Sequence, residues 1–96
     1  MKVKISQDVR GFLRSLAPEP RRQILCDLDL IESGKKQPEP LDEPLENFYK
    51  VRSGRYRILC AIQSNTILAL FADRRSTVYE VASAAFLEKI LHQMRE

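Results

Sequence analysis

The chain has 96 residues, of which 44% are hydrophobic and 30% are charged, and its formal net charge is +3. This length supports a single core, so we expect residues 1–96 to form one domain. The composition argues against a disordered chain, and no apolar run approaches the roughly 18 residues of a membrane span. The first residues lack an apolar leader, which predicts a cytoplasmic protein.

The first third of the chain predicts one short strand followed by a helical hairpin. Residues 2–5 alternate lysine with apolar residues, which is the period of a strand. The next segment has the i, i+3, i+4, i+7 spacing of an amphipathic helix, which Ser6 or Asp8 can cap. A second helix begins near Pro20, and Gly34 is suited to end it in a left-handed conformation.

The rest of the chain predicts a hairpin, one further strand and a C-terminal helix. Residues 35–46 contain three prolines and are expected to be a linker. The period then becomes two, which predicts strands over residues 48–52, 55–62 and 67–72, and residues 78–94 are again helical. The order β-α-α-β-β-β-α predicts an α+β fold with helices on one face of a mostly antiparallel, four-stranded sheet.

The net charge is concentrated in one third of the sequence. Residues 48–79 hold six cationic residues and one acid, for a net charge of +5, whereas each flanking segment has a net charge of −1. The cations are Lys50, Arg52, Arg55, Arg57, Arg74 and Arg75, and the acid is Asp73. Positive charge gathered in this way indicates an anionic partner.

A two-residue loop at residues 53–54 would fix the register of the predicted hairpin. Arg52 would then lie opposite Arg55, and Lys50 would lie opposite Arg57. Directly opposed like charges destabilise a sheet, so we interpret this face as a binding site for a polyanion. The alternative is a solvated hairpin end whose charges prevent edge-to-edge aggregation.

The residue inventory restricts the chemistry. His92 is the only histidine, and Cys26 and Cys60 are far apart and expected to be buried, so neither a metal site nor a cofactor is predicted. RNA can be cleaved without either, because its 2′-hydroxyl attacks the adjacent phosphorus and arginines stabilise the developing charge. Like charges around Lys50 would favour a neutral amine that acts as a base, and Tyr79 could transfer a proton or stack on a nucleobase.

The run from Phe48 to Leu59, FYKVRSGRYRIL, resembles the Tyr-Lys-hydrophobic-Arg, Gly and Tyr-Arg-hydrophobic signature of the RelE/ParE superfamily of bacterial toxins. Residues 74–79 are similar to the closing Arg and Val-Tyr of that family, and the helical hairpin and linker match its layout. The resemblance covers essentially the whole chain. It implies a RelE-like fold and the toxin of a type II toxin–antitoxin system.

The RelE branch cleaves mRNA in the ribosomal A site, so the resemblance implies a ribosome-dependent endoribonuclease. The catalytic residues that it implies are Lys50, Arg52, Arg57, Arg75 and Tyr79. In this scheme Arg57 and Arg75 stabilise the phosphate, and Arg55 and Arg74 bind RNA. Proton transfer is implied for Lys50, Arg52 or Tyr79, or Tyr79 stacks on the base. The implied protein partner is an antitoxin with an acidic, amphipathic segment that becomes ordered on binding.

Asp73 departs from the family pattern, because the best-known RelE type carries another arginine at this place. The ParE branch inhibits DNA gyrase without cleaving RNA, and it usually lacks the complete set of basic residues and tyrosine. A ParE-like gyrase inhibitor and an inactive RNA-binding relative are therefore the alternatives to a ribonuclease.

Overall fold

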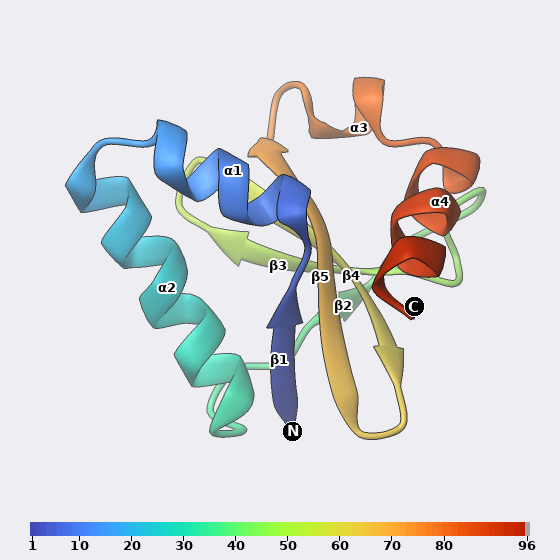
Figure 1. Ribbon diagram of the computed structural model, residues 1–96, viewed down its shortest axis with the longest axis horizontal. Helices are drawn as coiled ribbons and strands as arrows, with labels where there is room; N and C mark the ends of the chain where they lie inside the picture. The colour runs from blue at the N-terminus through green and yellow to red at the C-terminus, as the bar shows by residue number, and fades with distance from the viewer. Residues whose placement is uncertain (96) are drawn as a thin grey trace.

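The computed structural model describes residues 1–95. It is an α+β fold, as the sequence predicts, built from five strands and four helices (Figure 1). The elements are β1 (Lys2–Ile5), α1 (Gln7–Ser15), α2 (Pro18–Glu32), β2 (Glu39–Pro40), β3 (Tyr49–Ser53), β4 (Tyr56–Gln63), β5 (Thr66–Arg74), α3 (Val78–Val81) and α4 (Ala84–Met94). No helix within residues 1–95 is long and apolar enough to cross a bilayer.

The strands form one sheet in the order β1-β5-β4-β3-β2. Strand β1 runs parallel to β5 and the other neighbours are antiparallel, which confirms the prediction of a mostly antiparallel sheet. The fifth strand, β2, lies within the segment predicted to be a linker. It has only two residues and occupies the edge of the sheet, which is where a proline such as Pro40 is tolerated.

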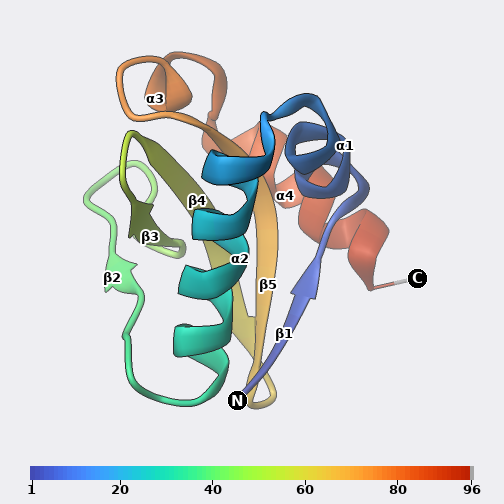
Figure 2. The same ribbon diagram turned by 90° about the vertical axis from the view of Figure 1, so that its left-hand side faces the viewer.

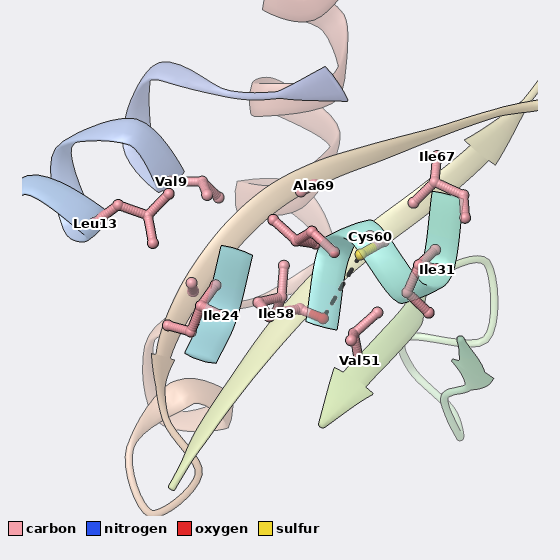
Figure 3. Close-up of a cluster of buried hydrophobic side chains, with 11 residues drawn as sticks. Val9, Leu13, Ile24, Ile31, Val51, Ile58, Cys60, Ile67 and Ala69 are labelled. Carbon is pink, nitrogen blue, oxygen red and sulfur yellow. Dashed lines mark hydrogen bonds between the residues drawn. The ribbon is translucent and has the colours of Figure 1, made fainter. Parts of the chain in front are cut away.

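Helices cover both faces of the sheet, so the prediction of helices on one face is wrong (Figure 2). Helices α1 and α2 pack on the first face around a core centred on Ile24, Ile58 and Cys60 (Figure 3). Helices α3 and α4 pack on the second face around Leu70 and Leu87. The nearly all-apolar β5 explains this arrangement, because a central strand covered on both sides needs apolar residues at successive positions.

Serine caps define the starts of two helices. Ser6 caps α1, because its Oγ accepts a hydrogen bond from the Val9 amide at 3.0 Å. Ser83 caps α4 by accepting from the Phe86 amide at 3.1 Å. This cap separates α3 from α4, so the single helix predicted over residues 78–94 is wrong at this point.

A β-bulge interrupts the pairing of β4 with β5. Leu59 pairs with Phe71 and Cys60 pairs with Ala69, so Leu70 is an extra residue in β5. Leu70 and Phe71 both contribute to the core beneath α4. The Ser6 hydroxyl donates a hydrogen bond to the Leu70 carbonyl at 2.7 Å and thereby ties the start of α1 to the bulge.

Only one of the two cysteines is buried. Cys60 lies in the core, and burial raises the pKa of its thiol to about 12. Cys26 is exposed on α2, so the prediction that both cysteines are buried is wrong for this residue. The apolar stripe of α2 consists of Ile24, Leu28 and Ile31, and Cys26 lies outside it.

We predict that Ser6→Ala lowers the free energy of unfolding by about 2 kcal/mol, because it removes a helix cap and the donor to a buried carbonyl. Ser53→Ala is the matched control. Ser53 is equally buried, but its Oγ has no hydrogen-bond partner among residues 1–95, so the change should be below about 0.5 kcal/mol. Urea denaturation measures both variants, and equal losses would contradict the role given to Ser6.

Candidate functional site

The turn between β3 and β4 consists of Gly54 and Arg55, because Ser53 pairs directly with Tyr56. The register predicted from a loop at residues 53–54 is therefore wrong. Gly54 has a φ of +58°, and two-residue hairpin loops of the type II′ class place glycine at this first position. Ser53 remains in the strand, where its side chain is buried on the side of α1 and α2.

The observed register still gathers three cations on one side of the hairpin. Arg52 lies directly opposite Arg57, and Lys50 lies opposite Leu59. We call the surface that carries Lys50, Arg52 and Arg57 the charged face; it is continuous with the core beneath α4, to which Leu59 belongs. Neither of the two predicted like-charge pairs exists: the like-charge pair in the structure joins Arg52 to Arg57, and Arg55 lies in the turn. Because Lys50 lies opposite Leu59, no like charge faces it directly from β4, and the charge repulsion expected there is absent.

The Arg57 side chain is fixed at the hairpin end of the charged face. Its Nη1 donates to the carbonyls of Gly54 at 3.0 Å and Tyr56 at 2.7 Å. Asp73 of β5 pairs with Arg57, and its carboxylate accepts a hydrogen bond from the Arg74 amide at 2.7 Å. Asp73 therefore places one negative charge beside the cations.

The two arginines at the end of β5 have different surroundings: Arg74 is the last residue of the strand, and Arg75 follows it. Arg74 pairs with Tyr56, so the alternation of the strand places it on the opposite side of the sheet from Arg57. The amide of Arg75 donates to the carbonyl of Arg55 at 2.8 Å, which joins the loop after β5 to the β3–β4 turn. Arg55 and Arg75 are thus neighbours at one end of the sheet, whereas Arg74 is separated from the charged face.

Tyr79 lies close to the charged face. It follows the fully buried Val78, which anchors α3, and its own side chain is 45% exposed. Partial burial raises the pKa of the Tyr79 phenol above its ordinary value; the charges of Arg57 and Arg52 act in the opposite direction, and the Glu39 carboxylate adds to the rise. The tyrosine is therefore within electrostatic reach of these three groups.

A pocket of about 500 Å³ adjoins the charged face. Lys50 and Tyr79 contribute to its lining. The remaining walls come from residues 40–45, before β3, and from residues 82–84, at the junction of α3 and α4. The pocket thus links the predicted site residues of β3 and α3.

Glu39 belongs to the candidate site, although no pattern in the sequence predicts it. Its Oε2 lies 2.9 Å from the Nε of Arg52. The residue is in β2, within the predicted linker, and no periodicity in a two-residue strand could reveal its partner. Among residues 1–95, no group of three or more histidine, cysteine or acidic residues could hold a metal ion.

Neither a protein-family model nor a curated protein sequence matches this chain. Solved structures do match. The toxin–antitoxin complex RelBE2 from Mycobacterium tuberculosis contains a chain that is 26% identical, with a TM-score of 0.65, over 77% of this chain and 96% of its own length. For the RelB–RelE antitoxin–toxin complex from Methanococcus jannaschii, the identity is 15% and the TM-score 0.64, over 82% of this chain and 98% of the other.

A copper-bound mutant toxin from Helicobacter pylori shares the fold at 7% identity, with a TM-score of 0.55 over 81% of this chain and 98% of its own. The mixed sheet between two helical layers is therefore the architecture of small toxins. More narrowly, this chain has a RelE-like toxin fold, which confirms the fold implied by the resemblance in its sequence.

We predict that Arg57→Gln raises the pKa of Tyr79 further, because it removes a positive charge that favours the phenolate. Glu39→Gln should lower the pKa of Tyr79, because it removes a negative charge that disfavours the phenolate. Arg74→Gln, on the other side of the sheet, is the matched control and should leave the pKa of Tyr79 unchanged. The measurement is a pH titration by NMR of the tyrosine rings, with Tyr79→Phe to assign the signal. Shifts of the same sign in the first two variants would contradict the arrangement.

Proposed function

We propose that this chain is the toxin of a toxin–antitoxin pair and that it cleaves mRNA on the ribosome. The observation that carries the proposal is the charged face, where Arg52 lies opposite Arg57 and Tyr79 is within electrostatic reach of both. The similarity to chains of RelB–RelE complexes supports the toxin role. A ribosome-dependent activity would place the protein in the cytoplasm.

In the proposed reaction, the 2′-hydroxyl of the RNA attacks the adjacent phosphorus and loses its proton to solvent. Arg52 and Arg57 stabilise the negative charge that develops on the phosphate oxygens. The Tyr79 phenol is protonated at neutral pH, as a tyrosine ordinarily is, and partial burial raises its pKa further, so it can donate a proton to the departing 5′-oxygen. The products are a 2′,3′-cyclic phosphate and a 5′-hydroxyl.

The remaining basic residues have different proposed roles. Lys50 faces a leucine across the hairpin, so we assign its ammonium to phosphate binding in preference to the role of general base. Arg55 and Arg75, joined through their backbones at the end of the sheet, extend the cationic surface along the RNA. Arg74 is on the other side of the sheet and has no role in this scheme.

The proposed protein partner is an antitoxin. The similar chains from M. tuberculosis and M. jannaschii come from complexes with both components. An acidic segment that covers the charged face would complement its cations and would exclude RNA from the pocket beside Lys50 and Tyr79.

We predict that Arg57→Ala lowers the rate of mRNA cleavage by about 100- to 1000-fold, as for loss of one donor to a transition-state charge. Arg74→Ala removes the same charge from the opposite side of the sheet and should change the rate by no more than a few-fold. Purified protein is added to translating ribosomes, and primer extension maps the cuts. Intact mRNA with the wild-type protein, or inhibition of DNA supercoiling by gyrase instead, would overturn the proposal.

A further inference from the structure

Arg52 is held at its backbone and at its side chain by groups from two different segments. The Lys36 ammonium donates to the Arg52 carbonyl and also lies 3.0 Å from Oδ1 of Asp27 in α2. The guanidinium of Arg52 meets Glu39 of β2 through its Nε at 2.9 Å. The contact with Lys36 holds the β3 backbone at Arg52, and the contact with Glu39 sets the direction of the Arg52 side chain.

The pairing of β2 with β3 makes the contact between Glu39 and Arg52 possible. Glu39 lies directly opposite Lys50, and because alternate residues share a side, Arg52 is its diagonal neighbour on the same surface. Long side chains can meet across such a diagonal. Glu39 forms its ion pair with Arg52 and none with the directly opposite Lys50; among the described residues the other ion pair is Lys36–Asp27.

The geometry of this ion pair leaves most of the guanidinium available. Arginine presents five N–H donors in a planar fork, and Glu39 uses the one on Nε. The two terminal nitrogens remain in position for the paired contact that a phosphate prefers. Both partners are about half exposed, so the ion pair contributes little to folding stability and its importance lies in orientation.

We propose that Glu39 is a positioning residue that orients Arg52 for the phosphate, an inference that rests on the proposed function. Its carboxylate repels RNA in the ground state, yet it holds the arginine in the direction needed when charge develops on the phosphate. Removal of Glu39 should therefore lower the cleavage rate without weakening RNA binding. A residue with only a structural or a long-range electrostatic role would not separate the two quantities in this way.

The experiment compares Glu39→Ala with Glu39→Gln. Glu39→Ala should lower kcat for cleavage by up to about 100-fold, because the guanidinium is no longer oriented, while RNA binds equally well or more tightly. Glu39→Gln should recover most of the rate, because its amide oxygen can still accept from Nε. Glu46→Ala is the matched control: it removes an exposed carboxylate from the same connecting segment and should leave kcat unchanged.

A double variant separates positioning from direct catalysis. If Glu39 acts only through Arg52, adding Glu39→Ala to Arg52→Ala should cause no further loss of rate. An additional loss in the double variant, or an unchanged kcat in Glu39→Ala, would overturn the proposal.

NMR of the Arg52 Nε–H group tests the orientation in the free protein, where Glu39→Ala should shift and broaden the signal. An unchanged signal would overturn the inference even if the protein cleaves RNA, whereas absence of cleavage by wild type would overturn the function alone.

Discussion

The extra residue in β5 is the constraint on which the arrangement of the charged face depends. In a regular strand, alternate side chains would place Ala72 on the side of α4 and Asp73 on the side of α2. The bulge places Leu70 and Phe71 on one side, so Ala72 enters the core beneath α2 and Asp73 lies beside Arg57. The Ser6 hydroxyl stabilises this irregularity by donating to the Leu70 carbonyl. One local departure from regular pairing thus links β1, α1 and the charged face.

The same surface of β4 serves as core at one end and as a candidate binding site at the other. Arg57, Leu59 and Ala61 occupy alternate positions and therefore share a side. The two apolar residues are covered by the layer that contains α4, whereas Arg57 lies beyond this cover near the hairpin turn. The site is consequently built on a rigid strand whose position the neighbouring core determines. Such a support holds charged groups more firmly than a free loop would.

Much of the fold could be predicted from the sequence, because the periodicity of its helices and strands is clear. The bulge could not, since an unbroken apolar run such as residues 67–72 shows no alternation from which a shift might be detected. The hairpin register depends on which residue adopts a positive φ, and Gly54 could occupy either position of a two-residue loop. Alternation correctly predicts that Lys50, Arg52 and Arg57 share a face, but it also places Arg55 there, which lies in the turn. Glu39 joins this face through a pairing between strands that no local pattern encodes.

The unequal burial of the two cysteines gives this small protein a built-in attachment point. A maleimide reagent reacts with thiolates, and the fully buried Cys60, with its pKa of about 12, presents essentially none at neutral pH. Cys26 is exposed on α2, which packs on the side of the sheet opposite the charged face. A fluorophore introduced there would occupy one defined place on each molecule and leave the cations uncovered. The native sequence is thus suited to fluorescence measurements of binding without any engineered residue.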